Sequence, residues 1–466
     1  MRDDNTSRSP GEPGEDPLSE LLRQLGINLP EGGMNLGAMM GQLQSMMTQA
    51  QAASDSATGI DWTMARQTAR QVAASLGPDP VPSQTQRTQL ADSHRLAESW
   101  LDPVVSFEAC PAPAQAWSRA QWVEDTMDSW RAIVEPVVTS IAEAMSSGLG
   151  GEAAAEIPEM AQLTGMLAPV MRMAAGQMYT SQLARAIGEI STEVMSGAEL
   201  GLQLLSTPRV VLLPANAEAF VKGLGLPGED TLMYVVVREA ARQRLFSSVR
   251  WLGPQMLALI EHYAREITID TRAISDTIDI GDVSEMTPGR LAEISEQLQG
   301  RLFKPTRTPE QEDILARLET LLALVEGWVD AVAHEACGRW LTHEAALLEA
   351  VRRRRATNGP TEKITSALLG LQLRPRLVRE SARFWQVVLA DRGVAGRDHL
   401  WSHPDLMPSA SDIEDPIGFV QGEPRHEETG ADWDLELTRL LEQTDPGDDG
   451  DRSPGDPDED TGSSPG

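Results

Sequence analysis

The chain of 466 residues is acidic, with 39 lysine and arginine residues against 70 aspartate and glutamate residues and a formal net charge of −31 at pH 7. This balance argues against DNA or RNA as a partner, because phosphate binding needs a basic surface. Two cysteines are too few for a disulfide framework or a cysteine-rich zinc site, whereas 41% apolar residues suffice for a sizeable core. We therefore expect a globular, cytoplasmic protein that binds no nucleic acid.

Residues 1–60 are predicted to form a largely disordered N-terminal region. The first 17 residues are rich in Pro, Gly, Asp and Glu and lack the apolar stretch of a signal peptide. A methionine-rich amphipathic stretch follows at residues 34–47, and methionine is common at adaptable binding surfaces. This stretch is either a docking helix for a partner or a loosely packed N-terminal helix. No apolar run approaches the roughly 18 residues of a membrane span, so we expect no membrane association.

Residues 61–421 are predicted to form one mainly α-helical domain with at most a small β element. Helices are expected at residues 62–76, 83–100, 116–146, 162–203, 254–267, 287–298, 308–356 and 375–389. The best strand candidate is Arg209–Pro214, which is short and β-branched. Gly223–Gly228 formally matches G-x-G-x-x-G, but a helical segment precedes it, so we predict a helix C-cap and a turn. Residues 422–466 are predicted to be an acidic disordered tail.

The centre of the chain is Thr231–Leu252, which reads TLMYVVVREAARQRLFSSVRWL. It is apolar nearly all round, which predicts a buried helix. Its middle, R-E-A-A-R, has the spacing of the zinc motif H-E-x-x-H, in which two histidines on one helix face bind zinc and the glutamate acts as general base. Glu239 occupies the general-base position. Arg238 and Arg242 occupy the histidine positions but cannot bind zinc, because a guanidinium group has no lone pair to give.

Two arginines on a buried helix need acidic partners, and the predicted helix at residues 308–356 offers them. Glu326, Asp330 and His334 follow one another at intervals of four and broadly share a face. Either Glu326 is the third ligand of a metal site, or Glu326 and Asp330 pair with the two arginines and hold the helices together. The basic run Arg352–Arg355 is interpreted as a solvated cap that complements the helix dipole.

Two further pairs have a spacing that could bind a metal. His262 and Glu266 lie four residues apart in an expected amphipathic helix, and His399 and His403 lie four apart in a segment rich in glycine, proline and tryptophan. Pro404 makes a continuous helix through the second pair improbable. Both pairs are interpreted as structural, and residues 396–408 are predicted to form an ordered loop packed on the core.

Four segments occur in a characteristic order, at residues 238–246 (REAARQRLF), 249–252 (VRWL), 326–328 (EGW) and 396–408 (GRDHLWSHPDLMP). Together they resemble the actinobacterial zincin-like metallopeptidase type 2 family over Ile60 to Val420. Members are often called hydrolases or zinc-dependent metalloproteases, and one branch is linked with coenzyme F420 biosynthesis. The resemblance implies a zincin-like helical fold, with Glu239 as general base and Glu326 as candidate third ligand. Arg238 and Arg242 then replace two of the three zinc ligands.

Three functions remain open at this point. The first is a zincin-like pseudoenzyme that binds no cofactor and acts as a binding or scaffold module for a protein or peptide. The second is an active zinc-dependent metalloprotease or hydrolase with a rearranged metal site, in which His262, His334 or another residue supplies a ligand beside Glu239 and Glu326. The third is a helical interaction protein that uses its methionine-rich N-terminus and acidic tail as contacts. The two arginines favour the first.

Overall fold

The computed structural model describes residues 60–149, 176, 179–267, 308–357, 359–361, 363–364 and 375–422. Helices dominate these residues, which confirms the predicted mainly α fold. They are α3 (Trp62–Ser75), α4 (Gln84–Leu101), α5 (Arg119–Leu149), α8 (Pro214–Leu224), α9 (Gly228–Ser248), α10 (Leu252–Arg265), α13 (Pro309–Cys337), α14 (Glu344–Ala356), α16 (Pro375–His399), α17 (Ala410–Glu414) and α18 (Pro416–Gln421). The predicted methionine-rich stretch, the acidic tail and the expected helix at residues 287–298 lie outside the described residues.

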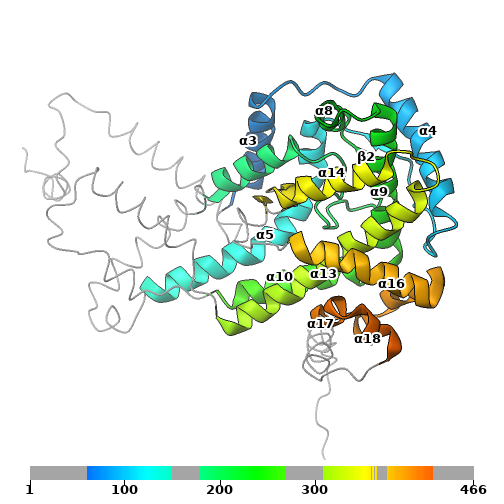
Figure 1. Cartoon of the computed structure of the whole chain (residues 1–466). Helices are drawn as coiled ribbons and strands as arrows, with labels where there is room; N and C mark the ends of the chain where they lie inside the picture. The colour runs from blue at the N-terminus through cyan, green and yellow to red at the C-terminus, as the bar shows by residue number, and fades with distance from the viewer. Residues whose placement is uncertain are drawn as a thin grey trace, which may run out of the picture. The chain divides into compact units, whose positions relative to one another are not determined.

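Helix α13 is the element against which most of the core is built. It packs against α4, α9, α10, α14 and α16, and it runs through the middle of these helices in Figure 1. Gly327 allows α16 to approach closely, since a Cβ atom there would lie 2.5 Å from the Oγ of Ser381 and 2.7 Å from the backbone nitrogen of Ala382 in α16. Trp328 beside it is fully buried. The middle of α13 is therefore enclosed on several sides.

A two-stranded parallel sheet is the only sheet among the described residues. Strand β1 (Gln115–Ala116) pairs with β2 (Val211–Leu212), with Gln115 opposite Val211. The predicted strand at Arg209–Pro214 is thus confirmed, although only its centre pairs. Ser196 adds an isolated antiparallel bridge to Leu212. This small sheet brings the segment around Ser196 towards α9.

The expectation of helices from residue 162 to residue 203 is wrong in its last part, and residues 162–175, 177 and 178 lie outside the described residues. The helix ends at Ser191, and residues 192–203 form turns and irregular structure. The side chain of Asn216 explains the ending, because its Nδ2 donates to the carbonyls of Ser191 and Val194 at 2.8 and 2.6 Å. The first bond satisfies a carbonyl group that the helix end leaves without an intrahelical partner, and the second holds the segment that follows.

Two other predicted helices are divided. The expected helix at residues 308–356 is interrupted after Cys337, and α14 starts only at Glu344. The stretch Thr231–Leu252 likewise ends as a helix at Ser248, and α10 starts at Leu252. The turn before α9 is as predicted, because Gly225 caps α8 in the left-handed conformation with φ 67°. The break after α13 matters most for the site, since it turns α14 back along α13.

Residues 396–408 are ordered and packed on the core, as predicted, although the part up to His399 is helical. A kink at Gly393, with φ 65° and ψ −175°, separates this last part of α16 from the helix that begins at Pro375. Two 3₁₀ helices, η2 (Leu400–Ser402) and η3 (Pro404–Leu406), follow α16. The ring of Trp401 stacks on Trp385 and Trp251, with centroids 5.4 and 6.4 Å apart. His399 is exposed, and His403 accepts a hydrogen bond from the backbone of Asp405. No helix among the described residues has both the length and the apolar character needed to cross a membrane.

Candidate functional site

The R-E-A-A-R sequence lies in the buried middle of α9. The exposed fractions of Arg238, Glu239 and Arg242 are 3%, 0% and 2%, because α4, α8, α13 and α14 all pack against this helix. The prediction of a buried helix is confirmed for the part up to Phe246. Burial of two guanidinium groups is costly unless carboxylates and hydrogen bonds compensate it. The neighbouring helices supply these carboxylates.

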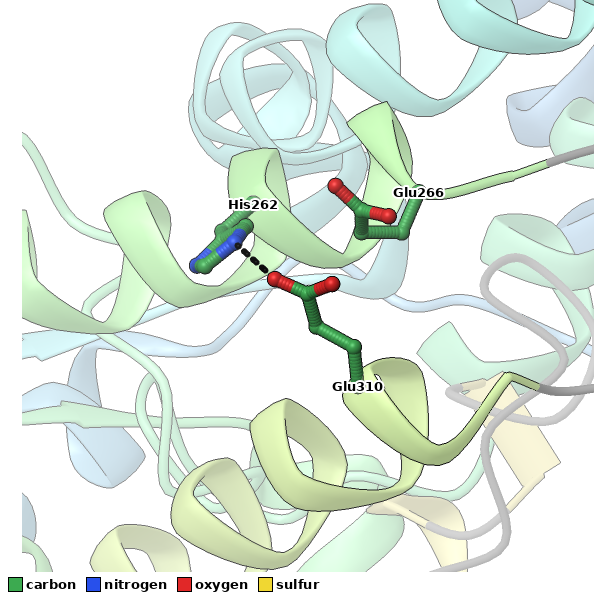
Figure 2. A group of neighbouring side chains, drawn as sticks. All are labelled: His262, Glu266 and Glu310. Carbon is green, nitrogen blue, oxygen red and sulfur yellow. Dashed lines mark ion pairs between the residues drawn. The ribbon is translucent and has the colours of Figure 1, made fainter. Parts of the chain in front are cut away.

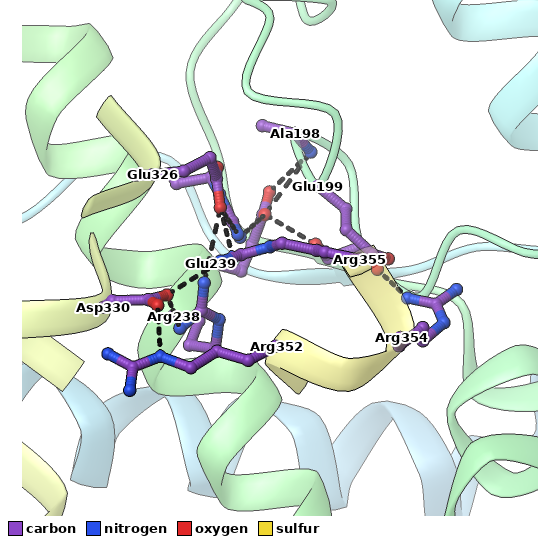
Figure 3. Close-up of polar contacts among 11 residues, drawn as sticks. Ala198, Glu199, Arg238, Glu239, Glu326, Asp330, Arg352, Arg354 and Arg355 are labelled. Carbon is purple, nitrogen blue, oxygen red and sulfur yellow. Dashed lines mark hydrogen bonds and ion pairs between the residues drawn. The ribbon is translucent and has the colours of Figure 1, made fainter. Parts of the chain in front are cut away.

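Glu326 of α13 binds both arginines of α9. The Nε of Arg242 lies 2.6 Å from its Oε1 and the Nη2 lies 2.8 Å from its Oε2, which is the two-pronged geometry of a strong arginine–carboxylate pair. Arg238 reaches the same Oε2 at 3.3 Å and the Oδ1 of Asp330 at 2.7 Å. The predicted pairing of Glu326 and Asp330 with the two arginines is confirmed. Figure 3 shows the two carboxylates facing α9.

Two arginines of α14 complete the group. Arg355 pairs with Glu326 and lies 3.0 Å from the Oδ1 of Asp330, while the Nε of Arg352 lies 3.3 Å from the other oxygen of Asp330 (Figure 3). The interpretation of the basic run as a solvated cap is therefore wrong for these residues, because the break after Cys337 turns them inward. We call Arg238, Arg242, Arg352, Arg355, Glu326 and Asp330 the arginine–carboxylate cluster.

The arginines keep both carboxylates of this cluster charged. Burial acts to raise the pKa of Glu326, but Arg242 and Arg355 outweigh burial and hold the pKa below its usual value. Burial likewise acts to raise the pKa of Asp330, and Arg355 and Arg238 again lower it. The ionised carboxylates in turn hold the pKa of Arg238 above its usual value, although burial opposes this. The cluster is thus a set of buried charges that stabilise one another.

Glu239, at the general-base position, makes separate contacts. Its carboxylate accepts hydrogen bonds from the Ser196 hydroxyl at 2.7 Å, the Gln243 side chain at 2.8 Å and the Ala198 backbone at 3.1 Å. Arg242 lies 3.7 Å away. Burial raises the pKa of Glu239, although Arg242 and the hydrogen bonds act to lower it. The protein therefore satisfies this carboxylate itself, and Glu239 is not among the residues that line the cavity beside the cluster.

The segment at residues 196–201 covers the carboxylates of Glu239 and Glu326, and it contains two glycines that matter for its path. A Cβ atom at Gly197 would meet the Cβ of Val211 at 2.9 Å and the Oε1 of Glu239 at 3.2 Å. Gly201 has φ +73°, a backbone conformation that favours glycine, and a Cβ there would lie 3.5 Å from Glu326. Close packing therefore favours glycine at position 197, and the backbone conformation favours it at position 201.

A cavity of about 90 Å³ borders the cluster. Its walls include Arg238, Arg242 and Glu326, together with Arg354 and Arg355 of α14. Arg354 pairs with Glu199 on the opposite wall (Figure 3). The rest of the lining is largely apolar and includes Met195, Leu200, Val235, Leu322 and Val351. The cavity is small and mostly apolar, and its arginines come from the walls formed by α9 and α14.

The residues of this site do not fit a catalytic zinc ion. No histidine or cysteine of the described residues lines the cavity, although zinc in catalytic sites takes three protein ligands. Glu326, the candidate third ligand, already binds three guanidinium groups. Arg238 and Arg242 also place two positive charges at the positions of the histidine ligands. These charges would repel a divalent cation there.

The structure brings neither alternative histidine to this site. His262 lies 3.7 Å from Glu310, at the start of α13. Glu310 and Glu326 are 16 residues apart on one helix, which corresponds to about 24 Å. The Nδ1 of His334 contacts Glu344 at 3.0 Å, and His334 is absent from the cavity lining. The rearranged metal site with His262 or His334 therefore has no support from this geometry.

Sequence reasoning missed several residues of the site. Ser196, Ala198 and Gln243 hold Glu239, and the first two belong to an irregular segment with no periodic pattern. Gln243 lies four residues after Glu239 on the same helix, so its spacing could have revealed it. The spacing of Arg352 and Arg355, which share a helix face, could have suggested inward-facing cations.

Comparisons with known proteins agree on the fold. The family model described as zincin-like metallopeptidase matches residues 60–420. A solved structure from Chloroflexus aurantiacus, described as "a putative hydrolase with a novel fold", is similar with a TM-score of 0.55 and 18% sequence identity. The similarity covers 79% of this chain and 99% of that one, and at this identity it shows the fold alone. No protein with a curated description matches the chain.

Proposed function

The chain belongs to the family of zincin-like metallopeptidases, and from that premise we propose that it is a pseudoenzyme, which keeps the fold but holds no catalytic zinc. It would act as a binding or scaffold module. The observation that carries the proposal is the two-pronged bond of Arg242 to Glu326, at 2.6 and 2.8 Å. Arg242 stands at a histidine position of the zinc motif, and its guanidinium group binds Glu326, the candidate third ligand, directly.

The state of the general-base position supports the same proposal. In the zinc motif the glutamate acts on a metal-bound water molecule. Glu239 is fully buried and accepts hydrogen bonds from Ser196, Ala198 and Gln243. Freeing this carboxylate would leave three buried donors without a partner, at a cost of about 1–3 kcal/mol for each. Its contacts are those of a structural residue.

The proposed partner is a protein or a peptide. A formal net charge of −31 argues against nucleic acid. A surface that once contacted peptide chains can outlast the loss of the metal chemistry, because the fold and the binding surface do not depend on the zinc ligands. A cavity of about 90 Å³ has room for one small side chain of such a partner.

Three finer expectations from the sequence are also part of this proposal. They are the cytoplasmic location, the actinobacterial affiliation and the link of one branch with coenzyme F420 biosynthesis. The first rests on composition, and the other two rest on the four resembling segments alone. None of them affects the chemistry of the site.

The proposal is tested by hydrolysis assays on the full chain, with and without added zinc, over a panel of fluorogenic peptides and esters. We expect no metal-dependent turnover, and the same background rate for the wild type and for Glu239→Gln. Metal-dependent turnover that Glu239→Gln abolishes would overturn the proposal and would establish an active hydrolase with a rearranged site.

A further inference from the structure

A second group of metal-ligand side chains lies outside the arginine–carboxylate cluster. His262 and Glu266 come from the last turn and the C-cap of α10, and Glu310 comes from the first turn of α13. One ligand atom from each lies within 4.8 Å of the other two. Figure 2 shows the carboxylate of Glu310 reaching towards α10, with His262 on one side and Glu266 on the other.

The arrangement matches the way helices bind metal ions. Residues four apart on a helix share one face, so His262 and Glu266 project in the same direction, and the third ligand comes from the neighbouring helix. Metal–ligand bonds of about 2.1 Å place the ligand atoms of a tetrahedral site about 3.4 Å apart. The Nε2 of His262 lies 3.7 Å from the Oε1 of Glu310. Small side-chain rotations therefore suffice to bring all three atoms to one ion.

The charges around this group favour a cation. Among the described residues, no arginine or lysine forms an ion pair with Glu266 or Glu310. Glu266 caps the C-terminal end of α10, where the helix dipole disfavours a negative charge. Two carboxylates thus lie near each other, one of them at an unfavourable helix end, and a bound cation would offset both unfavourable terms.

A His–Glu pair on α4 has the same spacing but a different charge environment. His94 and Glu98 have the same spacing on α4, and they contact each other at 3.0 Å. Glu98 also pairs with Arg244, so the protein itself supplies the cation there. No third ligand joins that pair among the residues that the structure describes.

We propose that His262, Glu266 and Glu310 form a binding site for a divalent transition-metal ion, with zinc as the best-fitting class. An imidazole with two carboxylates is a donor set that suits zinc and similar ions. Water would complete the coordination, since Glu310 is largely exposed. The ion would join the end of α10 to the start of α13. Because Glu310 and Glu326 are about 24 Å apart along α13, the role of the ion is structural.

The test is a titration of the untagged, metal-free full chain with zinc alone, followed by calorimetry and by elemental mass spectrometry after dialysis. We expect one zinc ion per chain. His262→Ala and Glu310→Gln should each weaken binding by about tenfold or more, because even the loss of an outer-shell partner costs 10–100-fold. Both side chains are partly exposed, so both variants should stay folded, which circular dichroism can check.

His343→Ala is the matched control. His343 is also partly exposed and contacts Asp230 at 3.0 Å, and no third ligand among the described residues joins them. This variant should therefore bind zinc as the wild type does. Absence of saturable binding, or binding that His262→Ala and Glu310→Gln leave unchanged, would overturn the proposal. Binding that Glu326→Gln abolishes instead would place zinc at α9 and would contradict the proposed function separately.

Discussion

Two groups of charged residues that each include a glutamate of α13 have the same arrangement but different chemistry. Near the middle of α13, Arg238 and Arg242 of α9 face Glu326. At its start, His262 and Glu266 of α10 face Glu310. In both groups a pair four residues apart on one helix meets a glutamate of the next. The first group contains its own cations and is buried, whereas the second has none and is partly exposed.

This difference teaches that spacing alone does not define a metal site. The R-E-A-A-R sequence has the spacing of a zinc motif, but guanidinium groups occupy the ligand positions and neutralise Glu326. The spacing of His262 and Glu266 matches no named motif, yet among the described residues no arginine or lysine pairs with Glu266 or Glu310. The charge that the surrounding helices supply decides which pair can bind a metal ion.

The largest expected effect follows from removing Glu326. Glu326→Ala leaves the guanidinium groups of Arg238, Arg242 and Arg355 without a shared carboxylate in a buried site. Loss of one partner of a buried ion pair costs about 3–5 kcal/mol, and we expect this decrease in the free energy of unfolding. Chemical denaturation measures it.

The control for this variant is Glu349→Gln. Glu349 pairs with Arg353 on the exposed face of α14, and exposed pairs contribute about 1 kcal/mol or less. An equal decrease in the free energy of unfolding for the two variants would mean that Glu326 has no special structural role.

Bound zinc should produce the next largest effect. At a free zinc concentration one hundred times the dissociation constant, binding to the folded state stabilises it by about 2.7 kcal/mol. We expect this increase for the wild type and for His343→Ala, and none after chelation. In Glu310→Gln, a tenfold weaker affinity reduces the increase to about 1.4 kcal/mol at the same zinc concentration, and a greater loss of affinity reduces it further. An increase in Glu310→Gln as large as in the wild type would show that the ion binds elsewhere.

Glu239→Gln should have a smaller effect. The amide keeps the size of the carboxylate but turns an NH₂ group towards donors such as Ser196 and Ala198. We expect the free energy of unfolding to fall by about 1–3 kcal/mol, the cost of a buried group without a partner. Thermal or chemical unfolding measures this. A catalytic residue would instead be replaceable with little or no loss of stability.

The smallest expected effect is on the pH dependence of stability. The pKa values of Glu326 and Asp330 are lowered in the folded state, so the unfolded chain binds more protons below pH 5. Stability is then fully present above the unfolded pKa values, about 4, and is lost as the pH falls through the folded ones. Glu239, with a raised pKa, acts in the opposite sense and favours folding at lower pH.

Asp330→Asn should therefore flatten the loss of stability between about pH 5 and pH 3, where the unfolded carboxyl titrates. Unfolding midpoints over this range measure the slope. A variant with the same slope as the wild type would show that Asp330 does not contribute to acid sensitivity.

The sequence predicted those parts of the site that depend on local periodicity. The apolar residues around Arg238 and Arg242 indicated burial, and burial required the acidic partners Glu326 and Asp330. Arg355 could not be placed, because the break between Cys337 and Glu344 changes the direction of the following helix and has no strong sequence signal. Helix direction is a property of packing, which residue spacing does not encode.

Contacts between distant segments were the other part that the sequence could not predict. Ser196 reaches Glu239 across 43 residues, and it does so from an irregular segment that the small sheet positions. Glu310 meets Glu266 only because α10 packs on α13. The pair of His262 and Glu266 was visible in the sequence, but the third ligand required the fold.

The most direct test of the account is the metal content of Arg238→His/Arg242→His, made in a His262→Ala/Glu310→Gln background so that the second site cannot contribute. We predict that the parent background, with its arginines, holds no zinc. The variant should gain one zinc ion per chain, bound by the two new histidines and Glu326, and Glu326→Gln should remove it. Zinc that Glu326→Gln removes from the parent background, or no zinc in a folded double variant, would contradict the account.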